Sequence, residues 1–228
     1  PVEQHTPWAT HLYQADDHIS QLLSAQSQAL SEFSVAHSLS RLVPDNSALF
    51  IGNSLPIRLM DMFSEANSKQ QQIFTNRGAS GIDGLLASAI GVSKIHHQRP
   101  VTLLLGDTSL LHDLNSMALL KQLQNPFVII VLNNDGGSIF NLLPLPDDEQ
   151  TVRDCYQLPH GLNFAHAAAM FGIHYLQPTQ QQEFELDYAA ALIEPGATLI
   201  EINVPAKQSS EMISAIAAQV KRLHLACL

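Results

Sequence analysis

Runs of apolar residues recur along this chain, and stretches with helical spacing separate them. Residues 101–107 (VTLLLGD) and 127–134 (FVIIVLNN) are the clearest, because their Val, Ile and Leu residues are nearly continuous rather than alternating with polar ones. Continuous apolar runs are typical of strands buried on both faces, and their alternation with helices is typical of parallel sheets. The sequence therefore predicts an α/β fold, with a parallel β-sheet flanked by helices on both faces.

The same patterns set the bounds of the expected elements. We predict strands over residues 47–53, 72–75, 101–107, 127–134, 173–178 and 197–203. We predict helices over residues 18–42, 55–65, 81–94, 110–124, 163–171, 180–193 and 209–225. Residues 1–17 are polar and irregular in pattern, so we interpret them as a linker from a preceding domain, followed by one domain over residues 18–228. Because the chain begins with Pro1 rather than Met, we expect it to be the C-terminal part of a longer protein.

The charge and the cysteine content of the chain indicate which kinds of binding partner and which cellular compartment to expect. The chain has 11 basic and 21 acidic residues, for a formal charge of −10, so we expect neither nucleic acid nor an anionic membrane as the main partner. Two cysteines are too few for a disulfide framework, which favours a reducing, cytoplasmic location. We expect no membrane span, because no apolar stretch approaches the roughly 20 residues that one requires.

Oxygen-bearing side chains follow two of the predicted strands, at the point where each strand ends. Gly106 and Asp107 follow the first run, and Asn133, Asn134 and two glycines end the second. Ligands of open parallel sheets bind outside the carboxyl ends of the strands, so these residues are expected to share a site. Carboxylate, amide and carbonyl oxygens suit Mg²⁺ or a similar hard cation rather than zinc.

A single carboxylate is a weak cation site by itself, which favours a metal shared with a phosphorylated cofactor. The helix after Asp107 would present free N–H groups to a diphosphate, and Gly136 and Gly137 would allow a ligand to approach closely. A simpler alternative stays open at this point: Asp107 caps the following helix, and residues 133–137 (NNDGG) form an ordinary turn.

The residues around these strand ends resemble a known family. Gly106-Asp107 followed by Asn133-Asn134 is similar to the G-D-G…N-N motif of thiamin-diphosphate-dependent enzymes, although Thr108 replaces the motif's last glycine. Four segments resemble one group of these enzymes, the 2-succinyl-5-enolpyruvyl-6-hydroxy-3-cyclohexene-1-carboxylate synthases of menaquinone biosynthesis. They are residues 52–61 (GNSLPIRLMD), 76–92 (NRGASGIDGLLASAIGV), 106–120 (GDTSLLHDLNSMALL) and 133–144 (NNDGGSIFNLLP).

The resemblance implies the diphosphate domain of a thiamin-diphosphate-binding fold, with thiamin diphosphate and Mg²⁺ (or Mn²⁺) as cofactors. It implies that the parent enzyme decarboxylates 2-oxoglutarate on the cofactor and adds the succinyl carbanion equivalent to isochorismate. It also implies a homo-oligomer, in which an N-terminal pyrimidine-binding domain from a second subunit supplies the activating glutamate. We therefore expect no catalytic residue within these 228 residues, and no activity from them alone.

The resemblance further implies roles for individual residues. The metal ligands would be Asp107, Asn134 and the carbonyl of Gly136. The cofactor-binding residues would be Ser80, Ile82, Gly106, Asp107, Ser109, Asn134 and Gly136, with Ile82 propping the cofactor into its bent shape. The substrate-binding residues would be Ser54, Arg58, Arg77, Ile139, Phe140 and Leu143. The two arginines would receive substrate carboxylates, which a guanidinium binds with two parallel hydrogen bonds.

Two other classes of function stay open from the sequence. The chain could be the diphosphate domain of another thiamin-diphosphate enzyme, such as an acetohydroxyacid synthase or a 2-oxoacid decarboxylase. It could also be a non-catalytic assembly module. The histidines show no metal spacing such as HExxH, so we interpret His112, His160, His166 and His174 as surface or satisfied core residues.

Overall fold

The computed structural model of the chain describes residues 9–66, 69–96 and 99–222. In these ranges six strands form one sheet, in the spatial order β2-β1-β3-β4-β6-β5, and every neighbouring pair is parallel. The strands are β1 (Ala48–Ile51), β2 (Gln72–Phe74), β3 (Val101–Gly106), β4 (Phe127–Asn133), β5 (His174–Leu176) and β6 (Ala197–Asn203). The predicted parallel α/β sheet is therefore confirmed.

Helices connect the strands. The α-helices are α1 (Thr10–Gln26), α2 (Glu32–Leu42), α3 (Leu55–Phe63), α4 (Leu85–Ile95), α5 (Asp107–His112), α6 (Glu149–Val152), α7 (Ala165–Phe171), α8 (Gln181–Ala191) and α9 (Gln208–Arg222). Between them lie the 3₁₀ helices η2 (Leu114–Gln122) and η3 (Ser138–Leu142) and the short π-helix η4 (Arg153–Gln157). No helix in the described ranges is long and apolar enough to cross a membrane.

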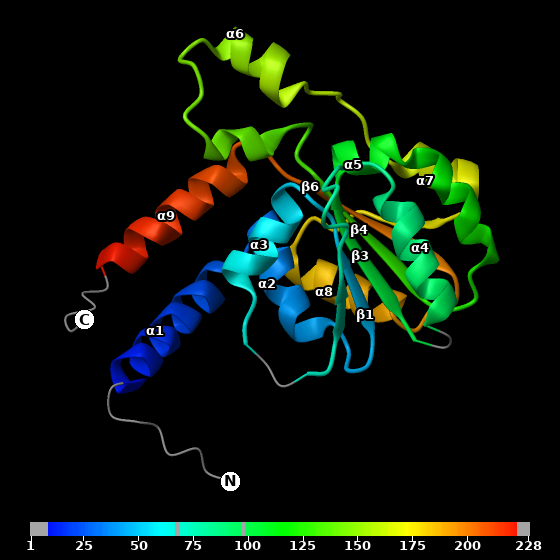
Figure 1. Cartoon of the computed structure of the whole chain (residues 1–228), viewed down its shortest axis with the longest axis horizontal. Helices are drawn as coiled ribbons and strands as arrows, with labels where there is room; N and C mark the ends of the chain where they lie inside the picture. Colours follow the sequence, from blue (N-terminus) through cyan, green and yellow to red (C-terminus); the bar gives the residue numbers. More distant parts are fainter. Residues whose placement is uncertain (1–8, 67–68, 97–98, 223–228) are drawn as a thin grey trace.

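The sheet separates two hydrophobic clusters, because successive side chains of a strand point to opposite faces. In β3, Leu104 belongs to the cluster packed under α2, α3 and α8, whereas Leu103 and Leu105 belong to the cluster under α4, η2 and α7. Figure 1 shows these two sets of helices on opposite sides of the strands. Both faces of the central strands are therefore buried, which explains why their sequences are continuously apolar.

The predicted helix over residues 18–42 is wrong in its extent, since the structure has two helices there. α2 begins with a capping box, in which the Ser31 hydroxyl accepts a hydrogen bond from Ser34 N and the Ser34 hydroxyl accepts one from Ser31 N. This cap satisfies the free N–H groups of a new helix start, so the chain turns between the two helices. α1 also begins at Thr10, inside the segment interpreted as an irregular linker. Residues 1–8 lie outside the described ranges, and the domain boundary stays a prediction.

The predicted helix over residues 110–124 is also divided. α5 begins at Asp107 and ends at His112, and the 3₁₀ helix η2 follows it. Asp113 lies at the junction, where its carboxylate accepts hydrogen bonds from Ala87 N (2.9 Å) and the Ser116 hydroxyl (2.5 Å). A side chain that binds the backbone of a neighbouring helix in this way competes with a continuous α-helix.

Candidate functional site

The structure brings the polar ends of β3 and β4 together. Gly106 is paired in register with Leu132, so the residues that follow both strands lie side by side. Asp107 Oδ2 accepts hydrogen bonds from Asn134 N (3.2 Å) and Gly136 N (2.9 Å), and Oδ1 accepts one from Thr108 N (2.6 Å). The carboxylate is 2% exposed, and it ties the end of one strand to the turn after the next. This cross-strand bonding goes beyond the simple helix-cap interpretation.

A cavity of about 400 Å³ opens at these strand ends. Most of the residues predicted to bind cofactor, metal or substrate line it. They are Ser54, Ile82, Gly106, Asp107, Ser109, Asn134, Gly136, Ile139 and Phe140. These residues come from the carboxyl ends of β1, β3 and β4 and from the segments that follow β1, β2, β3 and β4, so the parallel topology itself assembles the cavity.

Four predicted residues are not among those that line the cavity, and all four are exposed: Ser80, Arg58, Arg77 and Leu143. Arg58 Nη1 donates to the carbonyl of Ser54 (2.7 Å), and Arg77 Nη1 donates to Asn53 Oδ1 (2.9 Å). Both guanidinium groups are thus held beside the end of β1, near the cavity but outside its lining. Their substrate-binding roles stay predictions.

Glu32 lines the cavity although nothing in the sequence pattern singled it out. It is 1% exposed, and it accepts hydrogen bonds from Asn134 Nδ2 (2.8 Å) and the Ser209 hydroxyl. Burial raises its pKa to about 7, against the lowering effect of these two hydrogen bonds, and the charge of Asp107 adds to the increase. The site therefore contains a second buried carboxyl group, 102 residues from its amide partner along the chain.

His160 also lines the cavity, where its mostly buried, hydrogen-bonded ring fits the interpretation as a satisfied core residue, although the sequence did not place it beside Asp107. Its Nε2 lies 3.2 Å from Asp107 Oδ2, and its Nδ1 accepts a hydrogen bond from Leu162 N (3.0 Å). Because Nδ1 is an acceptor, the ring proton is on Nε2, which donates to the carboxylate. Asp135 Oδ1 holds this segment in place by accepting from His160 N (2.9 Å) and Gly161 N (2.7 Å).

The two glycines after β4 are required by the protein backbone itself. Gly136 has φ +118°, and a Cβ there would lie 2.2 Å from the Gln157 carbonyl oxygen. A Cβ at Gly137 would lie 2.4 Å from the Tyr156 carbonyl oxygen. The π-helical segment η4 approaches these glycines so closely that no side chain fits there. Their expected role in admitting a ligand stays a prediction.

Strained backbone is concentrated at this site. Within the described ranges, four residues other than glycine have positive φ: Asn46, Ser54, Asp135 and Leu158. Ser54 and Leu158 line the cavity, and Asp135 lies between two residues that do. Such conformations cost roughly 1–3 kcal/mol each and persist where the surrounding structure imposes them, which is common at functional sites.

The oxygen atoms at the strand ends fit a hard cation. Asn134 Oδ1 is buried and has no hydrogen-bond partner among the described residues, although the other end of the amide is bonded. A buried amide oxygen without a partner is unfavourable unless something else binds it. The Asp107 carboxylate and the Gly136 carbonyl supply further oxygens, which is the donor set that Mg²⁺ prefers.

Comparison with known proteins agrees with this geometry. Residues 59–202 match the family described as "Thiamine pyrophosphate enzyme, C-terminal TPP binding domain". The chain belongs to this family. The match includes Asp107 and Asn134, and it confirms the predicted thiamin-diphosphate fold and cofactor, since thiamine pyrophosphate is another name for thiamin diphosphate.

Individual relatives extend the similarity to this family along almost the whole chain. A 2-succinyl-5-enolpyruvyl-6-hydroxy-3-cyclohexene-1-carboxylate synthase of Aeromonas salmonicida is 48% identical over 224 residues, which are 96% of this chain and 38% of that protein. Synthases of the same name from Photobacterium profundum and Psychromonas ingrahamii are 47% and 48% identical over 97% and 96% of this chain. The chain thus spans less than half the length of the relatives it matches.

A solved structure supports the same fold. An X-ray structure of a protein from Mycobacterium smegmatis, assigned as a thiamin diphosphate-dependent enzyme, superposes with a TM-score of 0.61. The superposition covers 78% of this chain and 33% of that one, at 21% sequence identity. At this level of identity the likeness concerns the fold.

Proposed function

We propose that this chain is the diphosphate- and metal-binding part of a 2-succinyl-5-enolpyruvyl-6-hydroxy-3-cyclohexene-1-carboxylate synthase. In this proposal the whole enzyme decarboxylates 2-oxoglutarate and adds the remaining succinyl unit to isochorismate, in the cytoplasm and as a homo-oligomer. The observation that carries the proposal is the identity of 44–48% with synthases of this name over nearly the whole chain. The alternatives, another thiamin-diphosphate enzyme or an assembly module, have no comparable support.

The residues at the strand ends would hold the cofactor. Asp107, Asn134 and the Gly136 carbonyl would bind Mg²⁺ (or Mn²⁺), and through it the diphosphate, with Ser80 and Ser109 contacting the diphosphate directly. Bound thiamin diphosphate supplies an electron sink for the electron pair that remains when a 2-oxo acid loses carbon dioxide. Donation from His160 to Asp107 supports this arrangement, because it fixes the rotamer of the proposed ligand.

The remaining cavity residues would bind substrate and exclude water. Ile82, Ile139 and Phe140 supply apolar surface to the cavity lining, and Leu143 is exposed outside that lining. Arg58 and Arg77 would receive the carboxylates of 2-oxoglutarate and isochorismate, from their positions at the end of β1. An N-terminal pyrimidine-binding domain, proposed to come from a second subunit, would supply the activating glutamate and close the cavity.

A chimeric enzyme tests the proposal without any assumption about what precedes this chain. The 224 matched residues of the Aeromonas salmonicida synthase would be replaced by the corresponding residues of this chain. We expect the chimera to consume isochorismate with 2-oxoglutarate, and not with pyruvate. Asp107→Asn in the same chimera should abolish turnover. A folded chimera that binds thiamin diphosphate but turns over only pyruvate would favour an acetohydroxyacid synthase or decarboxylase instead.

A further inference from the structure

The two ends of the Asn134 amide have different surroundings. Nδ2 donates a hydrogen bond of 2.8 Å to Glu32 Oε1, whereas Oδ1 is buried and has no partner among the described residues. The residue is 5% exposed, so bulk water does not satisfy this oxygen. Asn134 lines the cavity together with Glu32 and Asp107. An unpaired acceptor in this position is available to a cation.

Glu32 is held firmly by groups other than Asn134. It is the first residue of α2, directly after Ser31, whose hydroxyl accepts from Ser34 N (3.0 Å) and so fixes the start of the helix. Its second carboxylate oxygen, Oε2, accepts a hydrogen bond from the Ser209 hydroxyl near the start of α9. Two helices from distant parts of the chain therefore determine where the carboxyl group of Glu32 lies.

This arrangement selects one orientation of the amide. The ionised carboxylate of Glu32 has only acceptor oxygens, so the group facing its Oε1 is the N–H₂ end of Asn134. The reverse orientation would place two acceptor oxygens against each other in a buried place. Because the oxygen and nitrogen of a primary amide are on opposite sides of one planar group, holding the nitrogen also fixes the direction of the oxygen.

We propose that Glu32 is a positioning residue, which orients the Asn134 amide so that Oδ1 faces the cation site. The inference rests on the proposed function, because it takes Asn134 as a ligand of the cofactor's metal. Glu32 lies outside residues 59–202, the range matched by the family model, so the assignment comes from the structure. Residues that orient metal ligands typically contribute about 10–100-fold to metal affinity.

Glu32→Gln tests the proposal with little change in side-chain volume. Glutamine can present either its oxygen or its N–H₂ group to Asn134, so it retains the packing but no longer imposes one orientation. Glu185→Gln is a matched control, because Glu185 on α8 accepts a hydrogen bond from Ser38 on α2 (2.8 Å) and does not line the cavity. All proteins would be the full 228-residue chain, with thermal melting used to confirm that each variant is folded.

The first measurement is the affinity for Mn²⁺, by electron paramagnetic resonance titration at saturating thiamin diphosphate. We expect Glu32→Gln to weaken Mn²⁺ binding about 10–100-fold and Glu185→Gln to change it less than about threefold. A change below about threefold in Glu32→Gln, or equal weakening by both variants, overturns the positioning role. If the unchanged chain binds no Mn²⁺, the proposed metal site fails and the inference fails with it.

The second measurement reports the amide orientation without any metal. The side-chain N–H₂ resonances of Asn134 in ¹⁵N-labelled protein, assigned by their loss in Asn134→Ala, should show one proton shifted downfield by its bond to the carboxylate. Glu32→Gln should reduce that shift, whereas Glu185→Gln should leave it in place. Unchanged Asn134 resonances in Glu32→Gln would overturn the proposal even if the metal affinity fell.

Discussion

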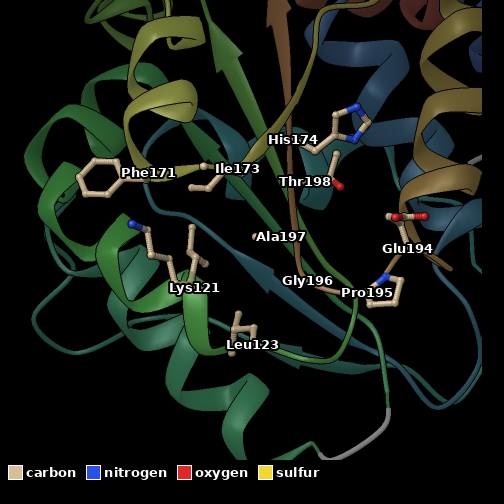
Figure 2. A pocket seen from close by; sticks show the side chains of 12 residues that line it. Lys121, Leu123, Phe171, Ile173, His174, Glu194, Pro195, Gly196, Ala197 and Thr198 are labelled. Carbon is tan, nitrogen blue, oxygen red and sulfur yellow. The ribbon is translucent and has the colours of Figure 1, made fainter.

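The two ends of the sheet both carry a cavity, yet only one resembles a functional site. The cavity at the carboxyl ends of the strands has a volume of about 400 Å³, and the one at the amino ends about 270 Å³. Figure 2 shows the amino-end cavity, with Lys121 and Glu194 on opposite sides of it. The two volumes are of the same order, so volume is weak evidence for choosing between the two cavities.

Burial of polar groups does distinguish them. At the amino end Lys121, His174 and Glu194 are all exposed, so water solvates their charged or polar atoms. At the carboxyl end Glu32 and Asp107 are 1% and 2% exposed. Burying a carboxyl group is costly unless specific partners compensate it, so a cluster of such groups in one cavity indicates function. The burial of the polar side chains that line a cavity is therefore a better guide to function than the volume of the cavity.

The largest expected effect is on cofactor binding. Asp107→Asn keeps the shape of the side chain but removes the only carboxylate among the proposed ligands. We expect the affinity for thiamin diphosphate with Mg²⁺ to fall roughly 100-fold, since charged hydrogen bonds and ion contacts of this kind are worth about 3 kcal/mol. Isothermal titration calorimetry measures it, with Glu194→Gln at the other cavity as the control. An equal loss in both variants would remove the distinction between the two ends.

Two glycines allow the same comparison for stability. Gly136→Ala should lower the free energy of unfolding by about 3 kcal/mol or more, because positive φ and a clash with the Gln157 carbonyl combine. Gly196, in the amino-end cavity, has φ +90°, but the atom nearest to a Cβ added there would be the Leu123 carbonyl oxygen at 4.0 Å, which is ordinary contact. Gly196→Ala should cost about 1 kcal/mol, from backbone strain alone. Urea unfolding of both variants checks the ranking, which a larger loss in Gly196→Ala would reverse.

Adjacent residues of β5 provide a third comparison. The Tyr175 hydroxyl donates to Glu201 (2.8 Å), a fully buried carboxylate that also accepts from Asn133 Nδ2 (2.6 Å) and Phe164 N (2.9 Å). Burial and then the bond to Glu201 raise the pKa of this phenol, so it remains a donor at ordinary pH. Tyr175→Phe should therefore cost about 1–2 kcal/mol.

The neighbouring exposed residue is the control for this third comparison. His174→Ala at the amino-end cavity should change the free energy of unfolding by less than about 0.5 kcal/mol. Chemical denaturation with both variants distinguishes the two positions. If Tyr175→Phe lowers the free energy of unfolding no more than His174→Ala does, the hydrogen bonds to Glu201 contribute little to holding the end of β4.

The smallest expected effect is at the amino-end cavity itself. The double variant Lys121→Ala/Glu194→Ala should bind thiamin diphosphate and Mg²⁺ as the unchanged chain does, and should unfold within about 0.5 kcal/mol of it. Calorimetric titration and urea unfolding are again the measurements. Weaker cofactor binding in this variant would show that the amino-end cavity influences the site across the sheet.

The part of the site that the sequence predicted is the part set by strand topology. Asp107 and Asn134 directly follow adjacent parallel strands, so their proximity follows from the pattern of apolar runs. Glu32 and His160 are on segments whose positions depend on tertiary packing, and no spacing rule connects them to the strand ends. Arg58 and Arg77 were placed at the correct strand end, although their side chains are outside the cavity lining.

The errors in the helices have a similar origin. The start of α2 was missed because the capping box uses Ser34 at the position where the recognisable sequence signature has Glu or Gln. The end of α5 was missed because Asp113 binds the backbone of α4, a contact that only the folded chain contains. Apolar spacing continues through both breaks, so periodicity alone predicts uninterrupted helices there.

The bonds of Glu32 have a consequence for the order in which the chain folds. Its two partners are 102 and 177 residues away, so the residues of β1, β3 and β4 leave the ribosome before Ser209 has been synthesised. Contacts of such large sequence separation form late. We therefore expect the sheet and the Asp107 contacts to protect amides from hydrogen exchange before α9 docks, and the docking of α9 to be the step that gives Asn134 its final orientation.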